Sequence, residues 1–264
     1  MRQLTLVGIG AGHPDHLTAA AARALMSADA ILLPVKGEDR AELAAIRRAL
    51  LSGLRPGGDL RVHEFIVPDR DPAIADYKQR VDHWHRMITA AWIAALNSIP
   101  ADARIVLPVW GDPSLYDSAL RIAERINSSV AEDQRLQIRV LPGLTAPQLL
   151  TAAHGITLND INGSVLITTG RRLRDQGWPD GADRLVVMLD GECSFASLNP
   201  TGIHIWWGAC LGMADRESLV NGPLATAGPQ IISTRASLRQ RHGWVMDVYL
   251  LARNGVMAGG GQSD

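Results

Sequence analysis

The sequence predicts an α/β fold whose first half contains a mostly parallel sheet covered by helices. Short apolar segments alternate with helical stretches as far as residue 154, the pattern of successive strand-helix-strand units. Loops containing glycine follow three of the predicted strands. After residue 163 the predicted strands lie closer together, which indicates a mixed sheet in a second, smaller α/β unit.

The predicted elements follow one another in a regular order. In the first half we expect strands near 3–7, 30–34, 60–67, 104–109 and 136–140, with helices at 18–28, 41–53, 73–98 and 117–128. The longest helix has the clearest pattern, because apolar residues recur there at steps of three or four: Ile74, Tyr77, Val81, Trp84, Ile88, Ala91 and Ala95. In the second half we expect strands at 164–169, 184–189, 203–207, 229–234 and 244–251.

A cluster of Asn, Asp and Gly at 159–163 marks the expected domain boundary. The prediction is an N-terminal domain over 1–158 with a mostly parallel sheet, and a C-terminal domain over 163–253 with a mixed sheet. Residues 254–264 are rich in glycine and have nothing to bury, so we expect a disordered tail.

Composition favours a soluble enzyme of a reducing compartment. Of the 264 residues, 47% are hydrophobic and 20% charged, and the formal net charge of −1 gives no global field to attract nucleic acid. Cys193 and Cys210 lie outside any C-x-x-C spacing, which disfavours a disulfide framework and a metal site. No apolar run approaches the ~18 residues of a membrane helix, and residues 1–7 read as a strand instead of a leader. We therefore expect a cytoplasmic protein with no membrane or nucleic-acid partner.

The three glycine loops are the most informative segments. They read VGIGAGHPD (7–15), WGDPSLY (110–116) and LPGLTA (141–146). Ligands of open α/β sheets sit beyond the carboxyl ends of the strands, and glycine lets backbone approach them closely. We expect the three loops to lie together.

The first and middle loops also allow other interpretations. A dinucleotide-binding fingerprint would need glycine where His13 stands and an acid where Pro34-Val35-Lys36 ends the next strand. The first loop can also be a purely structural turn. Asp112 can be the N-terminal cap of a helix over 113–128 instead of a ligand contact.

Taken together, the loops resemble the tetrapyrrole (corrin/porphyrin) methylase family. Its patterns are V-G-x-G-P-G-D-P-x-x-L-T, G-D-P-x-x-Y, and P-G-x-[ST]-[SA] followed by G-I-x-L, which is Gly155 to Leu158 here; Ala11 replaces the family's proline. The resemblance implies two α/β domains with the cofactor site in the cleft between them, S-adenosylmethionine as cofactor, S-adenosylhomocysteine as product, and a homodimer. The cofactor contacts that it implies are Ala11, Trp110, Gly111, Asp112, Leu115, Tyr116, Thr145, Ala146, Asp190 and Gly208.

Later motifs resemble one branch of this family. They are MLDG (188–191), WWGACLG (206–212) and RHGWVMDVYLL (241–251). The resemblance implies methylation of precorrin-5 at C1 with release of acetate, giving precorrin-6A. Two other functions stay open: a sister methyltransferase acting at another ring position, and a catalytically inactive small-molecule binding protein of the same fold.

The implied substrate is a macrocycle with many carboxylates, and arginine binds carboxylates through paired hydrogen bonds. Arg70, Arg171 and Arg172 follow predicted strands, so they are candidate substrate contacts; a solvated basic loop is the alternative. Releasing acetate would benefit from an acid or base. Asp190 and Glu192 are the candidates for that role, with a structural turn as the alternative.

Overall fold

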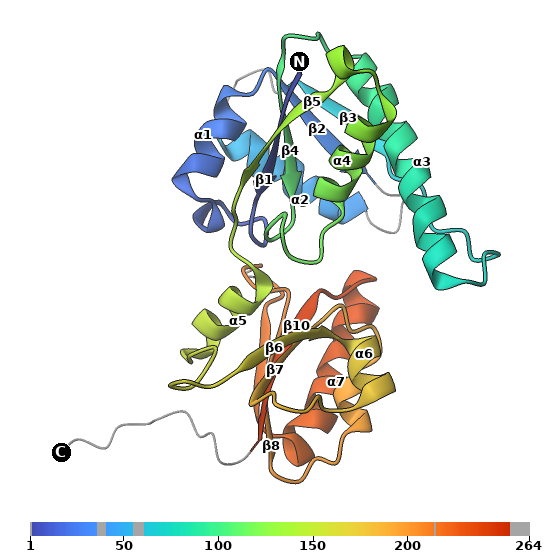
Figure 1. Cartoon of the computed structure of the whole chain (residues 1–264). Coiled ribbons are helices and arrows are strands. Elements are labelled where there is room, and N and C mark those ends of the chain that lie inside the picture. Colours follow the sequence, from blue (N-terminus) through green and yellow to red (C-terminus); the bar gives the residue numbers. More distant parts are fainter. Residues whose placement is uncertain (1, 36–40, 55–60, 214, 254–264) are drawn as a thin grey trace. The chain divides into compact units, whose positions relative to one another are not determined.

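The computed structural model describes residues 2–35, 41–54, 61–213 and 215–253. The chain divides into two compact units, Met1–Thr145 and Ala146–Asp264 (Figure 1). The predicted disordered tail, 254–264, lies outside the described residues.

The first unit contains a parallel sheet, as predicted. Its strands pair in the order β3-β2-β4-β1-β5, and each described pairing is parallel. The elements are β1 (Arg2–Gly8), η1 (Pro14–His16), α1 (Ala19–Ser27), β2 (Ala30–Val35), α2 (Ala41–Leu54), β3 (Val62–Ile66), α3 (Tyr77–Asn97), β4 (Arg104–Val109), α4 (Ala119–Ser129), η3 (Glu132–Gln134) and β5 (Leu136–Leu141).

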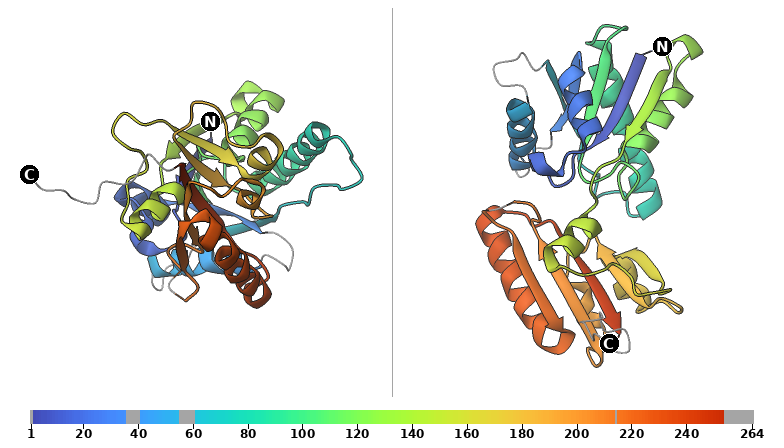
Figure 2. Two further views of the ribbon diagram at one scale, coloured as in Figure 1. Left: turned by 90° about the horizontal axis from the view of Figure 1, so that it is seen from below. Right: turned by 90° about the vertical axis from the view of Figure 1, so that its left-hand side faces the viewer.

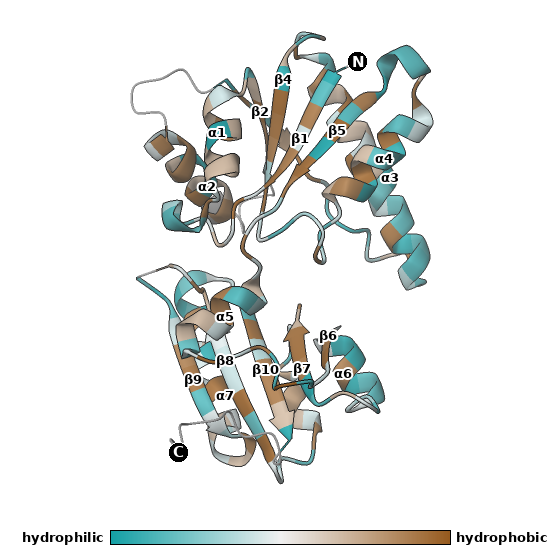
Figure 3. Cartoon of the chain, turned by 60° about the vertical axis from the view of Figure 1, so that its left-hand side comes forward, coloured by the Kyte–Doolittle hydropathy of each residue, from teal (hydrophilic) through white to brown (hydrophobic). Residues whose placement is uncertain are grey.

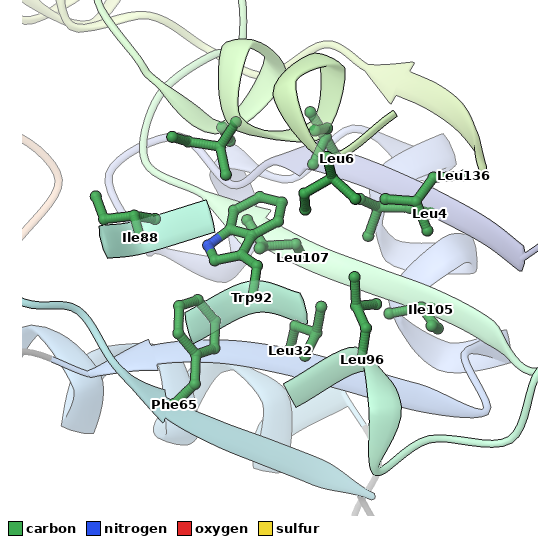
Figure 4. Close-up of a cluster of buried hydrophobic side chains, with 14 of the residues drawn as sticks. Leu4, Leu6, Leu32, Phe65, Ile88, Trp92, Leu96, Ile105, Leu107 and Leu136 are labelled. Carbon is green, nitrogen blue, oxygen red and sulfur yellow. The ribbon is translucent and has the colours of Figure 1, made fainter. Parts of the chain in front are cut away.

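Helices cover both faces of this sheet. One core joins α3 and α4 to the strands through buried side chains such as Trp92, Ile122 and Leu107 (Figure 4). The other joins α1 and α2 to the opposite face, around Leu25 and Ile31. The inner strands β2 and β4 are accordingly hydrophobic over most of their length, as expected for strands buried on both faces (Figure 3).

Helices α3 and α4 both begin later than the sequence predicted. Asp76 accepts a hydrogen bond from the amide of Gln79 at 2.8 Å, so α3 starts at Tyr77 and not at the predicted residue 73. Helix α4 begins at Ala119, two residues later than predicted; its N-cap residue Ser118 makes no side-chain capping hydrogen bond, and Asp117 accepts one from the Ala119 amide at 2.5 Å. None of the helices within the described ranges combines the length and apolar character needed to span a membrane.

The second unit contains the predicted mixed sheet, ordered β6-β7-β10-β8-β9. Only β6 and β7 pair in parallel there. The elements are α5 (Ala146–His154), β6 (Val165–Thr169), α6 (Gly170–Gln176), β7 (Arg184–Met188), η4 (Ser194–Ser197), β8 (Ile203–Ala209), β9 (Ser218–Pro223), α7 (Leu224–His242) and β10 (Asp247–Arg253). Helices α6 and α7 pack on one face, and α5 packs on the other (Figure 2).

The division between the units lies earlier than the predicted boundary at 159–163. Leu150 of α5 is fully buried against strands β7 and β10 of the second unit. Arg184 on β7, 1% exposed, donates to Asp160 at 2.5 Å and to the Thr157 carbonyl at 2.7 Å. The Asn, Asp and Gly cluster is therefore a loop fastened inside the second unit.

The predicted strand at 229–234 is wrong, because these residues form the middle of α7. Their β-branched residues favour a strand locally. Packing decides otherwise: Leu224, Ala227, Ile231 and Leu238 are buried on one helical face, while Ile232 is 44% exposed. Strand β9 was not predicted; it is a short edge strand in which Val220 alone is buried.

Candidate functional site

The three glycine loops of the first unit lie together at one edge of its sheet, as predicted. Strands β4 and β5 both pair in parallel with β1, so the three loops leave the sheet at the same edge. Gly10 and Gly111 form an isolated antiparallel bridge, in which the Gly111 amide donates to the Gly10 carbonyl at 2.8 Å. The loops therefore contact one another through their backbones.

Side chains would prevent part of this contact. A Cβ at Gly8 would lie 2.5 Å from the Gly143 nitrogen and 2.7 Å from the Gly111 oxygen, closer than any real Cβ approaches backbone. Gly111 differs, because its φ is +64° while a Cβ there would meet only the Leu144 oxygen, at 3.8 Å. Gly111 thus presents bare backbone toward open space, where a ligand can approach closely.

Asp112 joins the middle loop to the third loop. Its side chain is 9% exposed, and its carboxylate accepts hydrogen bonds from the Ser114 amide at 2.7 Å, the Ser114 hydroxyl and the Gly143 amide at 2.9 Å. Burial raises the pKa of Asp112, but these hydrogen bonds outweigh it and hold the pKa below the usual value. Asp112 does not cap a helix over 113–128, because α4 begins only at Ala119.

The remaining candidates of this unit surround the same backbone. Ala11 is half-buried between Gly10 and Gly12, which both have positive φ. Leu115 is half-buried, and Tyr116 is 43% exposed with a φ of +51°, a conformation that costs energy for a residue with a Cβ.

Trp110 lies under the first loop, and sequence reasoning missed its partner. A Cβ at Gly12 would lie 2.8 Å from the Trp110 ring, so the ring packs directly against the glycine. The Arg47 guanidinium of α2 lies over the same ring, 4.9 Å from its centroid. In the sequence, Arg47 reads as a solvated arginine beside Arg48, and nothing in the local pattern distinguishes the two.

The second unit has its own loop edge. Strands β7 and β8 both run antiparallel to β10 and therefore end at the same edge, as does β6. Leu189, Cys193 and Cys210 follow these strands with φ of +53°, +55° and +51°. Left-handed backbone at residues with a Cβ is costly and concentrates at functional sites.

Asp190 organises this edge. It is 5% exposed, and its carboxylate accepts hydrogen bonds from the Tyr249 hydroxyl at 2.7 Å, the Ser194 amide at 2.6 Å, the Ser194 hydroxyl at 2.9 Å and the Glu192 amide at 3.0 Å. A Cβ at Gly170 would lie 2.5 Å from Cβ of Asp190, so α6 begins in direct contact with it. These contacts fix the 189–194 loop, whatever further role Asp190 has.

A largely buried ion pair, which no local pattern predicts, supports the 189–194 loop. Arg235 of α7 donates to Asp247 at 3.0 Å and to the carbonyl of Asp190 at 3.1 Å. The Trp207 indole donates to the same Asp247 carboxylate at 2.9 Å. Burial is the main cause that raises the pKa of Asp247, while Arg235 opposes it.

The candidate substrate and catalytic residues fall into two groups. Arg171 and Arg172 are exposed on the first turn of α6, on the same edge as Asp190 and Glu192. Glu192 is exposed and forms an ion pair with Arg174. Arg70 belongs to the first unit, where its guanidinium lies 4.4 Å from the centroid of the Trp84 ring.

The last cofactor candidates have identifiable packing roles. A Cβ at Gly208 would lie 2.8 Å from a methyl group of Leu211 and 2.9 Å from one of Leu150, so both side chains pack closely against this glycine. Thr145 ends the first unit and Ala146 begins α5. Within the described ranges no group of His, Cys, Asp and Glu side chains is arranged to hold a metal ion.

Comparisons with known proteins agree over nearly the whole chain. A family model for tetrapyrrole (corrin/porphyrin) methylases matches residues 3–228. A precorrin-6A synthase (deacetylating) from Sinorhizobium sp. is 39% identical over 254 residues, which make up 96% of each chain. The crystal structure of a cobalamin synthesis related protein (CobF) from Corynebacterium diphtheriae has a TM-score of 0.79 at 34% identity, covering 96% of this chain and 99% of that one.

A more distant structure shares the fold. A uroporphyrin-III C-methyl transferase from Thermus thermophilus, crystallised with S-adenosylhomocysteine, has a TM-score of 0.54 at 19% identity over 95% of this chain and 97% of that one. The matching family model, the full-length relative and the converging glycine loops agree with one another: the chain belongs to the tetrapyrrole (corrin/porphyrin) methylase family.

Proposed function

We propose that this chain transfers a methyl group from S-adenosylmethionine to C1 of precorrin-5 and releases acetate, giving precorrin-6A. The observation that carries the proposal is the 39% identity to a precorrin-6A synthase (deacetylating) over 96% of both chains. The motifs at 188–191, 206–212 and 241–251, which carry the resemblance to this branch, form the loop edge of the second unit together with β10.

The first unit fits the proposed cofactor. The open position beside Gly111 admits a ligand against bare backbone, and Asp112 holds that backbone to the third loop. We propose that Ala11, Trp110, Gly111, Leu115, Tyr116 and Thr145 contact S-adenosylmethionine. Asp112 then acts by fixing the loop, because its own carboxylate is already occupied by three donors. From the second unit we propose Ala146, Asp190 and Gly208.

When bound, S-adenosylmethionine supplies a methyl group that its sulfonium already activates. The protein's main task is therefore to align the nucleophilic carbon and to exclude water. A strong base is not obligatory. The loops that Asp112 and Asp190 fix through hydrogen bonds suit this task, because a rigid loop holds bound groups in place without reorganising.

We propose that Arg171 and Arg172 hold carboxylate arms of the macrocycle, with Arg70 contributing from the first unit. For acetate release we keep Asp190 and Glu192 as the candidates. Glu192 has the more accessible carboxylate, while the oxygens of Asp190 are engaged by the 192–194 loop and Tyr249. In that step water adds to the acyl carbonyl, the bond from the acyl carbon to the ring breaks with its electron pair left on the ring carbon, and acetate leaves while the protons of the water pass to the base and the ring.

Incubation with S-adenosylmethionine and precorrin-5, read by mass spectrometry, tests the proposal. We expect a product with one added methyl group and an equal amount of acetate. A methyl gain without acetate would instead support a sister methyltransferase, and no product would support a binding protein of this fold.

We also propose that the protein is a cytoplasmic homodimer, as its family resemblance implies. Cys193 and Cys210 form no disulfide in the described structure, in keeping with a reducing compartment. Sedimentation at micromolar concentration tests the dimer.

A further inference from the structure

We propose that Arg47 is a carboxylate-binding residue beside the Gly111 loop, with Trp110 as the platform that positions it. This inference rests on the proposed function and assigns a binding role to a residue that the sequence motifs do not include. Arg47 lies on α2, and its guanidinium carbon is 4.9 Å from the centroid of the Trp110 ring. Trp110 immediately precedes Gly111, so Arg47 adjoins the loop proposed to bind the cofactor.

No acidic side chain among the described residues accepts a hydrogen bond from Arg47. Its Nε is shielded from solvent and has no hydrogen-bond partner among the described residues, and the same is true of the Trp110 indole nitrogen. Burial lowers the pKa of Arg47 to about 10, because a shielded guanidinium loses hydration. Leaving such a group unpaired is unfavourable, and a ligand carboxylate would supply the missing acceptors.

Asp117 interacts electrostatically with Arg47 but forms no ion pair with it in the described structure. One Asp117 oxygen instead accepts the Ala119 amide at the start of α4. Burial is the main cause that raises the pKa of Asp117, while Arg47 and the Ala119 amide oppose that rise.

The neighbouring arginine shows what an ordinary structural partner looks like here. Arg48 is exposed and forms an ion pair with Glu64 of β3 at 2.6 Å. Two consecutive arginines thus differ in environment. Arg48 has an ion-pair partner in the fold, whereas Arg47 lies over an aromatic ring and its Nε has no hydrogen-bond partner among the described residues. A stacked guanidinium beside a ligand loop is typical of arginine used for recognition.

The ligand chemistry is a carboxylate, which has two possible sources in the proposed reaction. One is the methionine moiety of the cofactor, and the other is an acetate or propionate arm of the macrocycle. Three probes separate them: S-adenosylhomocysteine, 5′-methylthioadenosine, which lacks the amino acid, and uroporphyrin III, a stable polycarboxylate tetrapyrrole.

Titration calorimetry of the wild-type protein, Arg47→Gln, Arg47→Lys and the matched control Arg48→Gln tests the inference. We expect Arg47→Gln to weaken one carboxylate probe at least tenfold, with Arg47→Lys intermediate and Arg48→Gln within twofold of wild type. A weaker affinity for S-adenosylhomocysteine with unchanged 5′-methylthioadenosine assigns the carboxylate to the cofactor. A weaker affinity for uroporphyrin III alone assigns it to the macrocycle.

Thermal melts of the same variants separate binding from folding. Unchanged affinities for all probes in Arg47→Gln, with or without a lower Tm, would overturn the inference and assign Arg47 to the fold. A wild-type protein that binds neither S-adenosylhomocysteine nor uroporphyrin III would overturn the proposed function, and this inference with it.

Discussion

Replacing Asp112 by asparagine is expected to loosen the contact between the middle and third glycine loops. The substitution keeps the shape of the side chain but exchanges one oxygen acceptor for an amide donor. Either the Gly143 amide or the Ser114 donors then lose their acceptor. A hydrogen bond to a charged, buried group contributes about 1.5–3 kcal/mol, so we expect the free energy of unfolding to fall by about that amount at pH 7.

The stabilisation by Asp112 should depend on pH. The folded pKa of Asp112 is depressed, so its contribution to stability is fully present above the unfolded pKa of about 4 and is lost as the pH falls from there through the lower folded pKa. Urea unfolding of wild type and Asp112→Asn should differ fully at pH 7 and converge as the pH falls below about 4. Asp102→Asn, at an exposed acid of the same unit, is the control. An equal difference at pH 7 and pH 3.5, or none at pH 7, would refute this account of the loop contact.

Two further predictions concern the second unit. Arg172→Ala should raise the KM for the macrocycle about tenfold, equivalent to a lost contact of ~1.4 kcal/mol, while the affinity for S-adenosylhomocysteine stays unchanged. The control is Arg239→Ala, at an exposed arginine of α7. An equal rise in KM in the control would argue against a specific contact at Arg172. Asp190→Asn should accumulate methylated product that still carries its acyl group, detected by mass. Normal acetate release in that variant would leave Asp190 as a loop residue held by Tyr249 and Ser194, and loss of cofactor binding would assign it to the cofactor instead.

The local sequence pattern was sufficient to predict the parallel sheet and the position of the loops at its edge. The alternation of strands and helices predicted the parallel sheet, and the parallel order then required the three glycine loops to leave it at one edge. The roles of the acids were less accessible. Asp112 is not the helix cap that the local sequence allowed, and its carboxylate binds the amide of Gly143, which lies 31 residues away in the sequence. Such a contact follows from strand pairing and leaves no sign in the local sequence.

Tertiary packing accounts for the remaining differences. Local propensity favoured a strand around Ile231, yet burial of one helical face made this segment part of α7. Arg235 and Asp247 are far from any motif, and only the fold joins them under the 189–194 loop. The local sequence does not distinguish Arg47 from Arg48. Their environments differ because the side of α2 that carries Arg47 meets Trp110, while Arg48 pairs with Glu64.

A paired substitution tests directly whether the Gly111 loop holds the cofactor. Gly111 and Gly243 have φ of +64° and +73°, and an added Cβ would meet one atom at 3.8 Å in the first case and none within 4 Å in the second. Asparagine tolerates this backbone conformation, so both replacements by Asn should cost similar stability. Titration with S-adenosylhomocysteine should show at least a tenfold loss of affinity for Gly111→Asn and wild-type affinity for Gly243→Asn. Wild-type affinity in Gly111→Asn would contradict the claim.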